Sequence, residues 1–226
     1  MDCSARQNTE RSQVFQWSAR SDQYSYRGGR NRMNIFAVSS NPREAASMLC
    51  DKHIVKMPIE SAQMLSTAHR FLDGTETVAT AINGRRYKTW THPSDALGSP
   101  LYRSTMINHP CTIWTRETIE NYLWHAQHAM ELCREYTRRY DRIHGSQKVI
   151  EWCVKNIPTN IPSGDLTPFA QAMPDEYKDS TNSVNAYREY YIGAKFSFAK
   201  WKSGLVPDWW PRKNFRKNQD NLLTTA

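Results

Sequence analysis

Apolar residues recur at helical spacing along much of the chain, and the longest such stretch opens with a clear helix-start signal. Asn41 fits an N-cap, Pro42 takes the first helical position, and Glu44 follows the cap by three residues. Pro58 lies within the same stretch, where it removes one backbone hydrogen bond and either kinks one helix or divides it in two. The helices expected from the periodicity cover residues 41–72, 110–140, 148–155 and 183–202.

Two further segments depart from the helical pattern. Met33 begins the apolar run MNIFAVSS, which has the character of a short strand. Residues 75–108 contain scattered glycines and prolines, so we expect a long irregular excursion with a short hairpin near residues 85–90. The sequence therefore predicts a mostly α fold: a single compact helical domain with a short N-terminal strand and a long excursion.

The ends of the chain differ in composition from its middle. Residues 1–32 are rich in Ser, Gln and Arg without apolar periodicity, which indicates a disordered basic arm or a start of translation placed too early. Residues 33–211 are expected to form the helical domain, and residues 212–226 a basic tail. A chain of 226 residues is long enough for one good core and does not demand a second domain.

One face of the first predicted helix carries reactive polar side chains where an apolar face is usual. Apolar residues flank this polar stripe on both sides, which favours the floor of a cleft. The ordinary alternative is a solvated surface with ion pairs such as Lys56 with Glu60. A separate charged arc, which includes His69 and Arg70, already supplies a water-facing side. The polar stripe consists of His53, Lys56, Glu60, Gln63 and Thr67.

A lysine beside a carboxylate suits amine-based covalent chemistry. In an apolar cleft, desolvation lowers the pKa of a lysine, and a neighbouring carboxylate can shuttle protons. Lys56 and Glu60 fit this description by their spacing, and His53 lies one turn before them. A structural ion pair explains the same spacing equally well.

A zinc site is a weaker possibility. Cys50-x-x-His53 and His109-x-Cys111 would supply two sulfur and two nitrogen ligands, but neither pair has a common zinc spacing. A buried cysteine on a helix usually only packs. No GxGxxG, GxxxxGK[ST] or GxSxG motif occurs, which lowers support for nucleotide-cofactor and hydrolase functions. We therefore expect neither a metal nor an organic cofactor.

Composition favours a polyanionic partner. The net charge is +8 with a sequence pI near 9.3, and the 8 Trp, 11 Tyr and 7 Phe supply a folded, aromatic interior. Near the C-terminus, Lys202, Arg212 and Lys213 alternate with aromatic residues, which would stack on bases while the cations neutralise phosphates. The alternative is an aromatic cluster over the core with a solvated basic tail.

Two observations bear on location. No apolar run approaches 18 residues, so a membrane partner is not expected. The five cysteines are an odd number without regular spacing or a preceding secretory signal, which predicts a reducing, cytoplasmic setting. The pattern leaves the oligomeric state open.

Five segments stand out along residues 33–210, namely MNIF, CDKHIVKMPIESAQMLSTAHR, NHPCTIWTRETIENYLW, LTPFAQAMPDEYKD and AYREYYIGAKFSFAKWK. Together they resemble a group of phage-encoded proteins over most of this range. Some of these proteins are similar to the pyrimidine-dimer DNA glycosylase family of the endonuclease V type.

The resemblance implies a mostly helical enzyme that kinks DNA, extrudes a base and attacks the sugar C1′ through an amine. Carried onto matching positions, Glu60 is the expected catalytic carboxylate. That glycosylase type uses the amine of an N-terminal threonine, and this chain offers no matching residue, because a start at Met33 leaves methionine before Asn34. Lys56 could substitute, or the lyase chemistry could be absent.

The leading hypothesis is therefore a phage-type base-excision glycosylase acting on DNA in the host cytoplasm, with or without AP-lyase activity. A non-catalytic nucleic-acid-binding protein is the main alternative, and a metal-dependent nuclease is a third. Glu60, Lys56 and His53 are the expected catalytic residues. The expected substrate-binding residues are Gln63, His109, Trp114, Arg116, Asn121, Lys202, Arg212 and Lys213.

Overall fold

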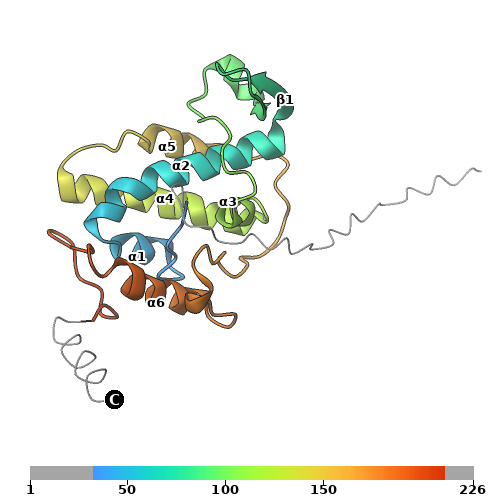
Figure 1. Cartoon of the computed structure of the whole chain (residues 1–226). Helices are drawn as coiled ribbons and strands as arrows, with labels where there is room; N and C mark the ends of the chain where they lie inside the picture. Colours follow the sequence, from blue (N-terminus) through green and yellow to red (C-terminus); the bar gives the residue numbers. More distant parts are fainter. Residues whose placement is uncertain (1–32, 212–226) are drawn as a thin grey trace, which may run out of the picture. The chain divides into compact units, whose positions relative to one another are not determined.

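Two long helices, α2 and α4, pack against each other at the centre of the computed structural model, which describes residues 33–211 (Figure 1). The helix α1 packs on α4, whereas α3 and α5 each contact both long helices. The predicted mostly α fold is confirmed. In chain order the elements are α1 (Pro42–Ser47), α2 (Asp51–Asp73), β1 (Thr75–Thr80), β2 (Arg86–Thr91), η1 (Pro93–Leu97), α3 (Pro110–Thr115), α4 (Ile119–Tyr140), α5 (Gln147–Lys155), η2 (Asp175–Tyr177) and α6 (Ser183–Lys195).

The first predicted helix is divided, but not at its proline. The helix α1 ends at Ser47 and α2 begins at Asp51, whereas Pro58 lies inside α2 without ending it. Cys50, the N-cap of α2, has an extended backbone, and its N–H donates to the hydroxyl of Tyr191 at 2.9 Å. This partner lies 141 positions away, so local periodicity could not report the break.

The second predicted helix is also divided, into α3 and α4. Thr118 caps α4, because its side-chain oxygen accepts the N–H of Asn121. The last helix, α6, ends at Lys195 rather than at residue 202. The short helix α5 agrees with its prediction.

The predicted N-terminal strand is wrong, since residues 33–40 join no sheet in the described part of the chain. The side-chain oxygen of Asn34 accepts the N–H groups of Ile35 and Phe36 at 2.8 and 2.9 Å, and Phe36 has a positive φ of 44°. Local bonds thus occupy the groups that a β-ladder would need. The amide of Asn34 also donates to the carbonyl of Ala172 at 2.9 Å, which fixes this segment in the core.

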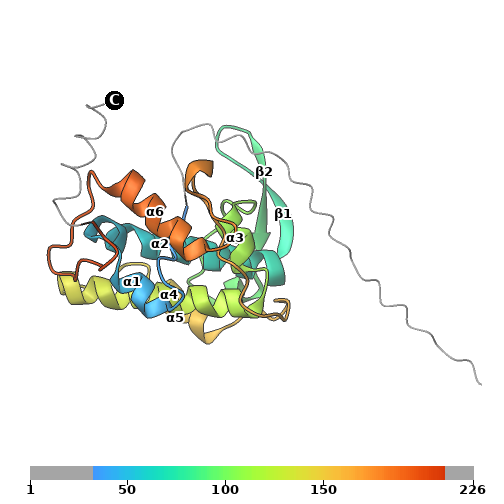
Figure 2. The same ribbon diagram turned by 90° about the horizontal axis from the view of Figure 1, so that it is seen from below.

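The predicted hairpin is confirmed and is longer than expected. The strands β1 and β2 pair antiparallel, with Thr75 opposite Thr91. The hairpin projects from the end of α2 in both views (Figure 1 and Figure 2), and η1 follows it. The rest of the excursion is irregular up to α3.

The buried apolar residues form two clusters, and both include residues of α2. One combines the segment 33–38 with α1, the first half of α2 and the tyrosines of α6. The other combines the second half of α2 with α4 and α5. No helix among the described residues is long and apolar enough to cross a membrane. The predictions for residues 1–32 and 212–226, including Arg212 and Lys213, lie outside the described residues.

A buried arginine ties the start of α2 to the end of α4. The side chain of Arg139 has no exposed area, and its guanidinium donates to Asp51 Oδ1 at 2.9 Å and to Glu135 Oε1 at 2.6 Å. Removing one partner of a buried ion pair leaves an uncompensated charge, which is more costly than losing an exposed pair. Arg139 is therefore expected to matter for stability.

Replacing Arg139 by methionine is expected to lower the free energy of unfolding by about 3 kcal/mol, because two mostly buried carboxylates each lose their buried cationic partner. Arg138 is the matched control, since it binds the same Glu135 with a side chain that is 53% exposed. Arg138→Met is expected to cost less than about 1 kcal/mol. Urea denaturation of the two variants measures both changes, and equal losses would contradict the role given to burial.

Candidate active site

Glu60 is a buried carboxylate with two nitrogen partners. It lies in the middle of α2 and is 7% exposed. Its Oε2 accepts the main-chain N–H of Asn34 at 3.0 Å, and its Oε1 lies 2.6 Å from the Nζ of Lys56, one helical turn away. The residue implied as catalytic by the resemblance thus joins α2 to the first described segment of the chain.

The environment of Glu60 favours a carboxyl group that is weaker as an acid than usual. Burial raises the pKa of Glu60, while the hydrogen bond and charge of Lys56 and the N–H of Asn34 oppose that rise. A carboxyl group whose pKa moves toward neutrality suits proton transfer in both directions. As the pH falls through this raised pKa, any reaction that needs the ionised form is lost.

Lys56 lies at the surface rather than in a desolvated cleft. Its side chain is 57% exposed, and the neighbouring Val55 and Ile59 are each 45% exposed. The polar stripe is therefore divided: Glu60 is buried, whereas Lys56 lies at the surface. This differs from the predicted cleft floor, because Val55 and Ile59, which flank the stripe on one side, are themselves partly exposed.

The arc predicted to face water is buried at its C-terminal end. His69 and Arg70 are 1% and 7% exposed. The hydroxyl of Tyr122 lies 2.8 Å from the Nε2 of His69, and Arg70 forms a two-pronged ion pair with Asp95. The residues that cover this end of α2 come from outside the helix, and helical periodicity carries no information about them.

His53 is buried between aromatic rings. Its Nδ1 lies 2.6 Å from the hydroxyl of Tyr191, and its ring stacks on Phe36 at a centroid distance of 4.4 Å. Burial lowers the pKa of His53 to about 3, and the charges of Lys195 and Lys56 act in the same direction. The ring is therefore neutral at pH 7 and positions the segment that contacts Glu60.

Two expected substrate-binding residues lie inside the fold. Trp114 is 3% exposed and packs against Phe169 and Trp124. Asn121 is fully buried, and its amide donates to the carbonyl of Trp114 and to the hydroxyl of Thr167. In this conformation neither side chain can reach DNA, because each already fills a place in the core.

The other expected contacts remain at or near the surface. Gln63 is half-buried and lies one turn after Glu60, and Lys202 is exposed. His109 is half-buried and caps α3 by accepting the N–H of Cys111.

The guanidinium of Arg116, a further expected contact, is held by carbonyls. It donates to the carbonyls of Ile107 and Thr112 and lies 4.2 Å from the ring centroid of Phe71. Burial lowers the pKa of Arg116 to about 10. Arg116 thus keeps its charge at pH 7 in a partly buried position.

Asn34 is the site residue that sequence reasoning missed. Its only signal was a small polar residue inside the apolar run MNIF. In the structure its side chain shapes a tight turn that directs its own N–H at Glu60. The role depends on a main-chain atom, which residue type does not reveal.

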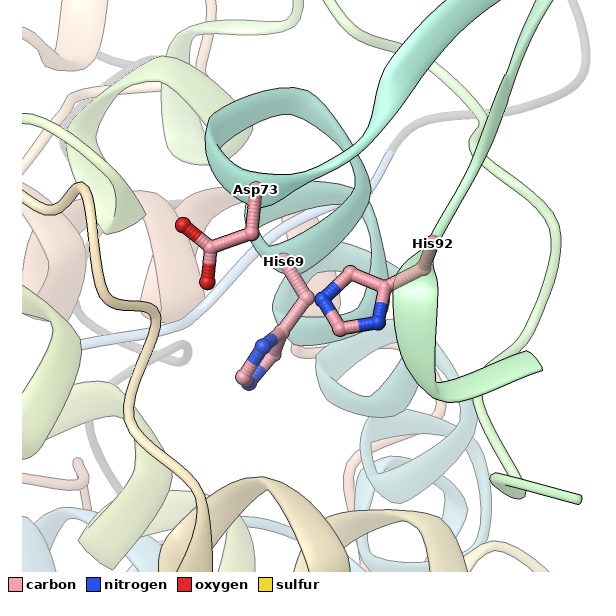
Figure 3. A group of neighbouring side chains, drawn as sticks. All are labelled: His69, Asp73 and His92. Carbon is pink, nitrogen blue, oxygen red and sulfur yellow. The ribbon is translucent and has the colours of Figure 1, made fainter. Parts of the chain in front are cut away.

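The sequence also offered a zinc set that the structure does not assemble. Cys50 and Cys111 are buried and free. Within residues 33–211, the group of potential metal ligands that comes together is a different one, namely His69, Asp73 and His92, whose ligand atoms lie within 4.8 Å of one another (Figure 3).

Comparison with known families assigns this helical protein to a class, the DNA glycosylases. Residues 33–147, about half of the chain, match the family model described as pyrimidine dimer DNA glycosylase, and the chain belongs to that family. No curated protein and no solved structure matches the chain. The resemblance stated from the sequence is thus confirmed, and the family implies DNA as the partner.

Replacing Lys56 by glutamine is expected to raise the pKa of Glu60 further, because Lys56 opposes the effect of burial through both its hydrogen bond and its charge. A carbon-13 NMR titration of the side-chain carboxyl measures that pKa directly. Lys52→Gln is the control, since Lys52 lies two turns before Glu60 on the same helix. Identical titrations in the two variants would show that the contact between Lys56 and Glu60 does not form in solution.

Proposed function

We propose that the protein is a DNA glycosylase that uses Glu60 as its catalytic carboxylate and an adjacent amine as nucleophile, with associated AP-lyase activity. Membership of the pyrimidine dimer DNA glycosylase family supports the reaction class. The observation that carries the site assignment is the position of buried Glu60 between two nitrogen atoms, one of them the exposed amine of Lys56 at 2.6 Å.

The chemistry follows from that geometry. Glu60 first accepts a proton from the Lys56 ammonium, and the freed lone pair forms a bond to the sugar C1′ while the bond to the base breaks and its electron pair leaves with the base. Glu60 passes that proton to the leaving base and, as a carboxylate again, takes a further proton from the attacking nitrogen. Opening of the sugar then gives an imine. Elimination from that imine cleaves the strand, which is the lyase step. The exposure of Lys56 supports access by an extruded nucleotide.

A second nitrogen meets the same geometric requirement. The main-chain nitrogen of Asn34 lies 3.0 Å from Glu60 Oε2. In a chain that begins at Asn34 it would be a primary amine, like the N-terminal amine that the resemblance implies, whereas in a longer chain it is an amide without nucleophilic character. Lys56 is the proposed nucleophile when residues precede Asn34.

The remaining expected residues divide between contact and support. We propose that Gln63, His109, Arg116 and Lys202 contact DNA, and that Arg212 and Lys213 add phosphate contacts. Trp114 and Asn121 would act indirectly, through the packing of α3 and α4. A phage origin and a place in the host cytoplasm belong to the same proposal, supported by the resemblance and by the free cysteines of the described residues.

Borohydride trapping tests the proposal. Purified protein is incubated with duplexes that contain a thymine dimer, uracil or an abasic site, and borohydride reduces any imine to a stable adduct. With the thymine-dimer duplex we expect an adduct and cleavage of one glycosidic bond, whose base stays joined to its neighbour in the dimer. Glu60→Gln is expected to slow this cleavage by at least about 100-fold, because it removes the proton acceptor and keeps the size of the side chain.

Comparing chains that begin at Met1, Met33 and Asn34 identifies the nucleophile. Loss of the adduct in Lys56→Gln but not in Lys52→Gln, in the chain from Met1, supports Lys56. An adduct that survives Lys56→Gln and forms only in the chain from Asn34 transfers the role to the main-chain amine. Binding of duplex with neither adduct nor released base from any substrate would refute the enzyme and favour the non-catalytic binding protein.

A further inference from the structure

Three potential metal ligands converge where the hairpin returns to the end of α2. His69 and Asp73 lie one helical turn apart on α2, and His92 follows β2 as the N-cap of η1. One ligand atom from each lies within 4.8 Å of the others, and His92 points toward His69 from the opposite side (Figure 3). The i, i+4 spacing places the first two side chains on one helix face.

One tautomer of His69 leaves a ring nitrogen free to bind a metal. The hydroxyl of Tyr122 donates to the carbonyl of Cys153 at 3.0 Å and lies 2.8 Å from the Nε2 of His69. When its single proton is on the Cys153 side, its oxygen accepts from Nε2, and Nδ1 of the neutral ring carries a lone pair. The ring also has a hydrogen bond to the main chain of Asn156, which competes with metal binding. A partner on the far nitrogen is how metal-binding histidines are usually held.

His92 directs a buried nitrogen into the same space. Its Nδ1 lies 2.6 Å from Ser94 Oγ and 3.2 Å from the main-chain nitrogen of Ser94. Its Nε2 is buried and has no hydrogen-bond partner among the residues that the structure describes. The tautomer that binds a cation donates from Nδ1 to Ser94 Oγ, gives up the bond from the N–H of Ser94, and carries its lone pair on Nε2. A buried imidazole nitrogen without a partner is costly, and a cation would satisfy it.

Asp73 retains capacity for one more partner. Its Oδ1 accepts from the main-chain and side-chain nitrogens of Asn160, and its Oδ2 accepts the N–H of Thr159 at 2.7 Å. Each carboxylate oxygen has two lone pairs, so Oδ2 can still bind a metal. The bonds to residues 159 and 160 fix the orientation of the carboxylate, as hydrogen bonds to metal-binding side chains usually do.

We propose that His69, Asp73 and His92 form a binding site for a zinc-type divalent cation. Two imidazole nitrogens and one carboxylate oxygen suit Zn²⁺, with water in the fourth position of a tetrahedron. The site is separate from Glu60, because nine residues of α2 span roughly 14 Å. The cation joins α2, the hairpin and the loop at residues 159–160, so its role is to hold the hairpin on the helix end.

Zinc binding by the untagged full-length protein tests the proposal. After removal of metal with a chelator, Zn²⁺ alone is titrated calorimetrically, and Co²⁺ absorption reports a tetrahedral geometry. We expect one ion per chain and a melting temperature that rises with Zn²⁺ concentration. His92→Asn keeps an N-cap acceptor but removes the ring nitrogen, and is expected to weaken binding by at least about 100-fold.

His109→Asn is the matched control, since His109 is also a half-buried N-cap histidine whose ring accepts a main-chain N–H. It is expected to leave Zn²⁺ affinity unchanged. Asp73→Asn gives a second independent variant should His92→Asn fail to fold, and it too is expected to lose the ion. Absence of micromolar binding by the unaltered protein, or equal affinities in the Asp73 or His92 variant and the His109 control, would overturn the site.

Discussion

A carboxylate buried away from water must find partners inside the protein, and the arrangement around Glu60 follows from that requirement. One oxygen is satisfied by a lysine from the same helix and the other by the main-chain N–H of Asn34. The second partner is available only if the segment that holds Asn34 is fixed in the core. The packing of this segment against α2 therefore places the main-chain nitrogen of Asn34 beside an oxygen of Glu60.

Residues far along the chain hold that segment. Ala172 accepts the side-chain amide of Asn34, and Tyr191 contacts both His53 and the N-cap of α2. Both residues lie beyond residue 147, where the match to the glycosylase family ends. The family-matched half of the chain thus carries the carboxylate, and the other half supplies the contacts that orient its surroundings.

The sequence predicted the helical class, the hairpin and the pairing of Lys56 with Glu60, because each of these depends on neighbours within a few positions. It did not predict where the long helices divide, since the break before α2 involves a bond between Cys50 and Tyr191. It also assigned His69 to solvent, because Tyr122 and Trp152, which pack against this ring, are distant along the chain. Asn34 escaped notice since its main-chain nitrogen makes the contact.

The bond between Asn34 and Ala172 has a consequence for the order in which the protein matures on the ribosome. The two residues are 138 positions apart, so the first described segment emerges long before its partner is synthesised. Until then, Ile35 and Phe36 lack the tyrosines of α6 that later enclose them. A nascent chain released early would carry Glu60 on α2 before Ala172 could fix Asn34 beside it.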